Sequence, residues 1–200
     1  MSYVDQYMEE AGKILNLIDK AEIEKMISLI LEIREGKGRL FFLGVGGGAG
    51  NCSHAVNDFR KIGGIESYTP VDNVSELTAR TNDEGWTTVF EEFLKTSHVG
   101  NKDGVFVFSV GGGDKEKNIS ANIVYALDYA KSKGAKILGV VGRDGGYTAK
   151  VADACVVISP INPDTVTPHT EAFQGVIWHL VVSDPRMMVM KNKWESIKQA

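Results

Sequence analysis

Three times along the chain, a short apolar run ends in a cluster of glycines and leads into a stretch of helical character. The runs are 39–45 (RLFFLGV), 105–110 (VFVFSV) and 136–141 (KILGVV), and the clusters at their ends are GVGGGAG, GGGD and GRDGG. A fourth run, 154–159, ends at Pro160. Strand, glycine loop and helix repeated in this order predict an α/β fold, a doubly wound parallel sheet with helices on both faces. Ligands of such sheets bind beyond the carboxyl ends of the strands, where these loops lie.

Helices are expected at both ends of this core. Apolar residues recur at helical spacing from Tyr3 to Arg34, which predicts two N-terminal helices with a break around Asp19 to Ala21. A last apolar helix is expected over 167–182. We expect a single domain over 1–200, made of the helical pair 1–35, the α/β core 38–182 and a polar, peripheral tail 183–200. Because one small sheet cannot cover the apolar stripe of the N-terminal helices, we also expect a homotetramer.

The charge and the cysteine content exclude several classes of protein. The net charge is -4, and no basic stripe is present to neutralise a phosphate backbone, so we expect no nucleic-acid partner. Cys52 and Cys155 are too few for a disulfide framework, and the first ten residues lack the features of a signal peptide. No apolar stretch reaches the roughly 18 residues of a membrane span. A cytoplasmic protein without membrane contact is therefore expected.

The first glycine loop, 44–50, follows a strand and opens a helix, so free N–H groups and the helix dipole favour an anion there. Gly46, Gly47 and Gly48 are the expected donors. The loop also matches a loose dinucleotide fingerprint, but no clear acidic residue follows at the end of the next strand, about 20 residues on, which makes NAD a weak alternative. A turn needed only for close strand-to-helix packing is the remaining interpretation.

Two pairs of potential ligands lie on two helices. His54 and Asp58 are four residues apart on the helix that the first glycine loop opens, so they share one face. Glu171 and His179 are eight residues apart on the last helix, again on roughly one side. Imidazole and carboxylate groups suit zinc or a similar divalent ion, and they also suit general acid/base proton transfer. By spacing alone, a pair of ordinary surface residues is the more frequent outcome.

The stretch GVGGGAGNCSHAVNDF resembles the phosphoheptose isomerase signature G-N-G-G-S-A-A-D-A-x-H-F-A-A-E-L without a gap. His54 falls on its His and Asp58 on its Glu. SELTARTNDEGW resembles S-x-L-T-A-x-x-N-D-x-G, and KILGVVGRDGG resembles the strand and glycine turn of the same family. The final helix of the family carries Q-E-x-H-x-x-x-x-H, and Glu171 and His179 reproduce the interval between its Gln and its last His. The similarity spans roughly 38–182.

This resemblance implies a sugar isomerase (SIS) domain, a flavodoxin-like three-layer sandwich with N-terminal helices, that interconverts sedoheptulose 7-phosphate and a glycero-manno-heptose 7-phosphate. It implies a divalent metal, by family zinc, held by His54, Asp58, Glu171 and His179. Asp58 and His179 would be the acid/base pair. Asn82 and Asp83 would line the sugar pocket or, more simply, form the turn before Gly85. Family members are homotetramers, which agrees with the N-terminal helices.

The second glycine loop departs from the family. Where the family has S-T-S-G-N-S, with hydroxyls that hold the sugar phosphate, this chain has Ser109, Val110, Gly111, Gly112, Gly113 and Asp114. Backbone N–H groups could still bind an anion, but Asp114 brings a negative charge to the expected phosphate position. Two alternatives therefore stay open: a non-catalytic SIS module that binds a phosphosugar or a protein, and an isomerase of a different sugar.

Two further histidines lie outside this set. His98 is expected to be solvated in a loop. His169, at the start of the last helix, is expected to be a solvated or capping group, with a role as a spare ligand as the alternative.

Overall fold

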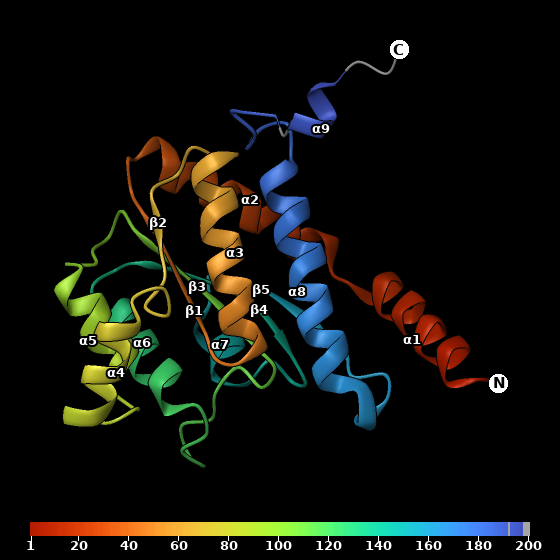
Figure 1. The fold of residues 1–200 in the computed structure, drawn as a ribbon, viewed down its shortest axis with the longest axis horizontal. Helices are drawn as coiled ribbons and strands as arrows, with labels where there is room; N and C mark the ends of the chain where they lie inside the picture. The colour runs from red at the N-terminus through yellow and green to blue at the C-terminus, as the bar shows by residue number, and fades with distance from the viewer. Residues whose placement is uncertain (192, 198–200) are drawn as a thin grey trace.

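The computed structural model describes residues 1–191 and 193–197, and the expected tail falls partly outside these residues. The helices and strands follow one another as α1 (Tyr3–Leu17), α2 (Lys20–Glu35), β1 (Leu40–Gly44), α3 (Gly47–Lys61), β2 (Ser67–Tyr68), α4 (Val74–Asp83), α5 (Val89–Thr96), β3 (Gly104–Ser109), α6 (Ala121–Ser132), β4 (Lys136–Gly142), α7 (Gly146–Val151), β5 (Ala154–Ile158), the 3₁₀ turn η1 (Pro163–Thr165), α8 (Val166–Ser183) and α9 (Lys193–Ser196). Figure 1 shows their arrangement.

The five strands form one parallel sheet in the order β2-β1-β3-β4-β5. This is the doubly wound order of flavodoxin-like folds, with a topological switch point between β1 and β3. β1 is buried along its whole length, and β3 and β4 are buried at all but one residue each. The predicted fold class is therefore confirmed. The short β2 and the helices α4 and α5 were not predicted, because none combines a long apolar run with a clear period.

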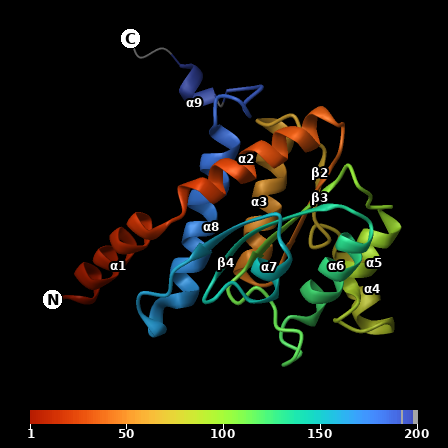
Figure 2. The ribbon, with the colours of Figure 1, turned by 180° about the vertical axis from the view of Figure 1, so that it is seen from behind.

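Two apolar cores cover the two faces of the sheet. Phe42, Phe106 and Phe108 point to the face that α2, α3 and α8 cover, whereas Phe41 and Val105 point to the face that α5 and α6 cover. This alternation follows from the two-residue period of a strand. α3 and α8 contact each other and run side by side in both views (Figures 1 and 2).

The N-terminal helices begin and end at capping residues that the sequence indicates. Ser2 and Asp5 form a capping box at the start of α1, and the Asp19 side chain accepts hydrogen bonds from the N–H groups of Ala21 and Glu22 at the start of α2. The predicted break between the helices is thereby confirmed. α2 packs on the sheet, while α1 projects from the body of the molecule in both views (Figures 1 and 2).

No helix among residues 1–191 and 193–197 is both long enough and apolar enough to cross a membrane.

Candidate functional site

Three of the four predicted metal ligands converge between α3 and α8. Nε2 of His54 and Nε2 of His179 each lie 3.8 Å from Oδ2 of Asp58, and one ligand atom from each residue falls within 4.8 Å of the other two. Two ligands of a tetrahedral zinc ion, each about 2.1 Å from the metal, lie about 3.4 Å apart. The observed separations are therefore close to those of a divalent-ion site.

Local contacts orient the groups of this cluster. Nδ1 of His179 lies 2.8 Å from the carbonyl oxygen of Gly175, so it donates there and leaves Nε2 free to act as a ligand or a base. Oδ1 of Asp58 accepts a hydrogen bond of 2.8 Å from the Asn57 amide, which leaves Oδ2 facing the two imidazoles. The side chains of His54 and His179 are 59% and 53% exposed, and that of Asp58 is 12% exposed. The cluster thus has a buried carboxylate floor and a mouth open to solvent.

Two polar residues that the sequence analysis missed hold α3 against α8. The Asn51 amide donates to the Glu171 carbonyl oxygen at 3.0 Å and to Oε1 of Gln174 at 2.9 Å. Gln174 is fully buried, and its amide donates to the Val140 carbonyl oxygen of β4 at 3.3 Å. The signal in the sequence was one polar residue on the apolar side of each helix, Asn51 on α3 and Gln174 on α8. These bonds fix the relative position of the helices that carry His54, Asp58 and His179.

The structure does not bring Glu171 to the cluster, which departs from the prediction of a four-residue ligand set. Its carboxylate packs on Gly47, where an added Cβ would lie 2.3 Å from Oε2 of Glu171. Eight helical residues correspond to about 12 Å, so Glu171 and His179 lie far apart along α8.

The same contact bears on the first glycine loop, where Gly46, Gly47 and Gly48 were expected to receive an external anion. An internal carboxylate already lies at Gly47. Gly48 is closely packed, because a Cβ there would lie 2.5 Å from the carbonyl oxygen of Phe108. Close packing of α3 on β3, the alternative interpretation of this motif, accounts for Gly48, and a carboxylate of the chain itself contacts Gly47.

A cavity of about 1220 Å³ opens at the second glycine loop, beyond the carboxyl ends of β3, β4 and β5. Gly111, Asp114 and the turn after β4 line it. Ser109 lies at the end of β3, and its Oγ accepts a hydrogen bond of 3.0 Å from the N–H of Gly112. A Cβ at Gly112 would lie 2.0 Å from the Gly145 carbonyl oxygen, so the loop packs directly on that turn.

Contacts within its own loop compensate the negative charge of Asp114. Its Oδ1 accepts hydrogen bonds from the N–H groups of Glu116 and Lys117, and its Oδ2 lies 3.3 Å from Nζ of Lys117. These contacts, first the backbone N–H of Lys117, hold the pKa of Asp114 below its usual value. The carboxylate thus organises its own loop.

Two cationic residues of the cavity wall, Arg143 and Lys150, were also missed by the sequence analysis. Four cations and three carboxylates line the cavity, namely Lys115, Lys117, Arg143, Lys150, Asp114, Glu116 and Asp144. Lys115 pairs with Asp128, and Lys117 pairs with Asp114. Across residues 1–191 and 193–197, the side chains of Arg143 and Lys150 have no ion-pair or hydrogen-bond partner. The Arg143 side chain lies over the second glycine loop, 4.0 Å from the Cβ position of Gly111.

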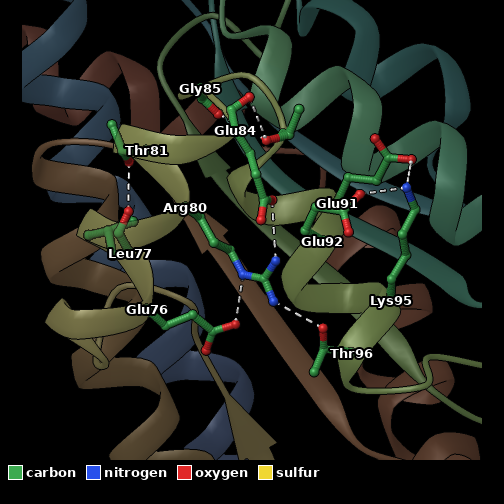
Figure 3. Close-up of polar contacts among 11 residues, drawn as sticks. Glu76, Leu77, Arg80, Thr81, Glu84, Gly85, Glu91, Glu92, Lys95 and Thr96 are labelled. Carbon is green, nitrogen blue, oxygen red and sulfur yellow. Dashed lines mark hydrogen bonds and ion pairs between the residues drawn. The ribbon is translucent and has the colours of Figure 1, made fainter.

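Asn82 and Asp83 lie at the end of α4, which packs on α5 at the sheet face opposite to α3 and α8. Both are exposed, and the Asn82 amide donates to Asp83. α4 has no buried residue, and Figure 3 shows Arg80 bonded to Glu76 and Glu84 of its own helix and helix end and, across to α5, to Thr96. The structure does not bring Asn82 and Asp83 to the cluster, and their position before Gly85 agrees with a helix end and turn.

The remaining histidines separate clearly. His98 is exposed, as predicted. His169, expected to be a solvated or capping group, is instead buried, with Nε2 3.0 Å from Oε2 of Glu10 and its ring stacked on Tyr7 at a centroid distance of 4.1 Å. The reason is that Tyr7 and Glu10 of α1 contact it at the start of α8.

The parallel sheet, its strand order and its glycine loops form the fold found in solved sugar isomerase (SIS) domains. The phosphoheptose isomerase structure from Neisseria gonorrhoeae has the same fold, with a TM-score of 0.77, 22% sequence identity, and coverage of 90% of this chain and 95% of that chain. No protein-family model matches the chain.

Sequence relatives then identify the family. The phosphoheptose isomerase of Sulfurimonas denitrificans is 31% identical over 172 residues, which cover 83% of this chain and 81% of that protein. The phosphoheptose isomerase of Aneurinibacillus thermoaerophilus is 26% identical over 181 residues, 88% of this chain and 86% of that protein. The chain belongs to the phosphoheptose isomerase family.

Proposed function

We propose that this protein is a metal-assisted aldose–ketose isomerase of a seven-carbon sugar phosphate, sedoheptulose 7-phosphate in the family to which it belongs. The convergence of His54, Asp58 and His179 from two helices carries this proposal. Their free nitrogen and oxygen atoms face a common point and are open to solvent on one side, as a site for a small polar substrate requires.

The reaction moves one proton between neighbouring carbons. In the ketose-to-aldose direction, a base removes a proton from C1, the C1–H electron pair forms the C1–C2 double bond of an enediol, and the C2 oxygen takes up a proton. Return of a proton to C2 and loss of the proton on the C1 oxygen give the aldose. Asp58 and His179 are the acid/base pair, since Oδ2 of Asp58 and Nε2 of His179 lie 3.8 Å apart and can serve carbon and oxygen of one substrate.

His54, Asp58 and His179 are also the residues that would hold a divalent ion, with zinc as the expected metal; the one free lone pair of His179, on Nε2, can hold the ion or accept the proton, not both at once. Two imidazole nitrogens and a carboxylate oxygen are a donor set that zinc accepts, and such a set leaves a fourth position for substrate. When bound, the ion would polarise the carbonyl group of the sugar. Glu171 remains a candidate fourth ligand only if its side chain leaves Gly47.

We propose that the phosphate end of the substrate binds in the cavity at the second glycine loop. Hydroxyl groups are few there, but the side chains of Arg143 and Lys150, which have no partner within residues 1–191 and 193–197, offer positive charge, and a guanidinium can bind phosphate through two hydrogen bonds.

The homotetramer and the cytoplasmic location also remain proposals. Tyr3, Val4, Met8 and Leu15 on α1 are large apolar side chains that are more than half exposed, which supports packing against other copies of the chain.

The second candidate is a non-catalytic module that binds a phosphosugar or a protein. The scarcity of hydroxyls in the second glycine loop favours it, and the open cluster of three ligand atoms opposes it.

A combined metal and exchange experiment separates the two candidates. The purified protein is analysed for metal, and sedoheptulose 7-phosphate is then incubated with it in D₂O and followed by NMR, beside other sugar phosphates and unphosphorylated sedoheptulose. We expect about one divalent ion per chain and deuterium at C2 of the aldose formed. A protein that binds the sugar phosphate without exchange would be the non-catalytic module. Arg143→Met should raise KM for the phosphorylated sugar and leave kcat nearly unchanged.

A further inference from the structure

Trp178 lies against both histidines of the cluster. Its ring stacks on that of His179 at a centroid distance of 3.4 Å, and it meets the ring of His54 edge-to-face at 4.7 Å. The two imidazoles are themselves 5.3 Å apart and nearly perpendicular. One indole therefore contacts a residue of α3 and a residue of α8 that face the same point.

The burial of these three rings differs sharply. Trp178 is 1% exposed and belongs to the core between the sheet and α3 and α8, whereas the imidazoles are more than half exposed. Close packing holds a buried indole in one orientation. The exposed imidazoles are less confined by packing than the buried indole, which forms a rigid surface behind them.

His54 depends on this surface more than His179 does. The His179 ring is fixed by its Nδ1 hydrogen bond to the Gly175 carbonyl oxygen. The His54 ring has no hydrogen bond within residues 1–191 and 193–197, and its contacts are Trp178, His179 and the 3.8 Å approach to Asp58. The final torsion of an imidazole is broad, so without the indole this ring would sample many orientations.

The indole also retains a polar atom that packing does not need. Nε1 of Trp178 is buried and has no hydrogen-bond partner in the described part of the chain. A buried donor without an acceptor is unfavourable, and Phe or Leu would fill apolar space without one. The indole N–H thus makes no hydrogen bond at this position, which points to a role for the aromatic faces of the ring.

We propose that Trp178 is a positioning residue of the metal and acid/base cluster, which holds the His54 and His179 imidazoles so that both Nε2 atoms face Asp58. This inference rests on the proposed function, since it concerns the same three residues. It adds that the geometry of the cluster is set from the core side by one aromatic ring.

Metal affinity tests the proposal without relying on activity. Zn²⁺ binding to the full chain is measured by competition with a chromogenic chelator for the parent, Trp178→Leu, Trp178→Phe and the control Phe90→Leu, a fully buried aromatic on the opposite face of the sheet. Supporting residues of metal ligands typically contribute 10–100-fold to affinity, so we expect a loss of roughly that size for Trp178→Leu and a smaller loss for Trp178→Phe. Phe90→Leu should bind as the parent does, even where its Tm is lower.

A spectroscopic readout covers the case in which Trp178→Leu fails to fold. In a Trp86→Phe/Trp194→Phe background, Trp178 is the sole indole, and Ni²⁺ bound between the two histidines should quench its emission, with His54→Ala abolishing the saturable quenching. Folded Trp178 variants with parental Zn²⁺ affinity, or a Ni²⁺-loaded protein with unquenched emission, would overturn the positioning role while leaving the metal site intact. A parent that binds neither ion would overturn both the metal site and the inference.

Discussion

Two carboxylate–histidine clusters share the helix α8 and differ in almost every physical property. At the start of the helix, His169 lies 3.0 Å from Glu10 of α1, and the two side chains are 4% and 7% exposed. Further along, His179 lies 3.8 Å from Asp58 of α3, with His54 at the same distance and both imidazoles open to solvent. The same two residue types thus form a closed pair and an open cluster within four turns of helix.

The closed pair is saturated with hydrogen bonds. Oε1 of Glu10 accepts bonds from Gln6 and Asn162, and Oε2 accepts a bond of 2.7 Å from Thr165 and lies 3.0 Å from His169. Such a carboxylate has no free lone pair to offer a metal or a substrate, and it joins α1 to the start of α8. In the open cluster, the Nε2 atoms of His54 and His179 both lie 3.8 Å from Oδ2 of Asp58, which is beyond hydrogen-bonding distance. Unfilled coordination, rather than residue type, therefore distinguishes the candidate active site from the structural pair.

The largest effect is expected on activity. His179→Ala and Asp58→Asn should each lower kcat by about 10²–10⁴-fold, the usual loss of one acid/base group, without changing the oligomer. Glu10→Gln, the matched change in the closed pair, should keep activity within a few-fold, as should His98→Asn. The measurement is isomerase turnover with gel filtration as a check on assembly. Parental turnover of the folded His179 variant would end the enzyme interpretation.

The second effect is on stability and should fall on the opposite cluster. Glu10→Ala leaves the buried Thr165 and His169 and the half-buried Asn162 without their acceptor, so Tm should fall by roughly 4 °C or more. Asp58→Ala removes a carboxylate that lies beneath two solvated rings and should change Tm less. Thermal unfolding followed by circular dichroism checks the difference. A larger loss for Asp58→Ala would contradict the assignment of the two clusters.

The third effect is a pH dependence. Hydrogen bonds, first that from Gln6 and then those from Asn162 and Thr165, lower the pKa of Glu10 from 4.5 to about 2. Between these values the unfolded chain binds more protons at this site than the folded chain, so its contribution to stability is full above pH 4.5 and is lost as the pH falls toward 2. The unfolding free energy of the parent minus that of Glu10→Gln should shrink over this range. A constant difference would show that Glu10 is not held in this way.

The smallest effect is expected from Asp58→Glu. The longer side chain restores the residue that the family signature carries at this position, and the exposed imidazoles have room to adjust. Activity and Zn²⁺ affinity should stay within about tenfold of the parent, well short of the loss from Asp58→Asn. Equal losses in the two variants would mean that the carboxylate position is set more tightly than its open surroundings imply.

Local patterns were enough to predict much of this molecule. The N-terminal break, β1, β3, β4, β5 and the last helix agree with their predicted positions, because burial on both faces of a strand and on one face of a helix leaves a direct period in the sequence. The pairing of His54 with Asp58 follows from four-residue spacing on one helix. The approach of His179 followed only from the family resemblance.

The predictions that failed concern groups whose partners lie far away in the chain. Glu171 was placed with the metal ligands by an eight-residue interval, but its carboxylate packs on Gly47, 124 positions earlier in numbering. His169 was expected in solvent because nothing near it in sequence shows that α1 covers it. Arg143 and Lys150 were overlooked because no local pattern indicates a cavity.

The sequence by itself determined β1, β3, β4 and β5, the glycine loops, the class of fold and which helix faces carry histidine and acid, since these depend on periods of two to eight residues. Only the tertiary structure decided which cluster is closed and which is open. The difference depends on where α1, α3 and α8 meet. Four donors surround the Glu10 carboxylate, which is therefore inert, whereas Oδ2 of Asp58 lies 3.8 Å from the Nε2 atoms of His54 and His179 and is available as a ligand or base.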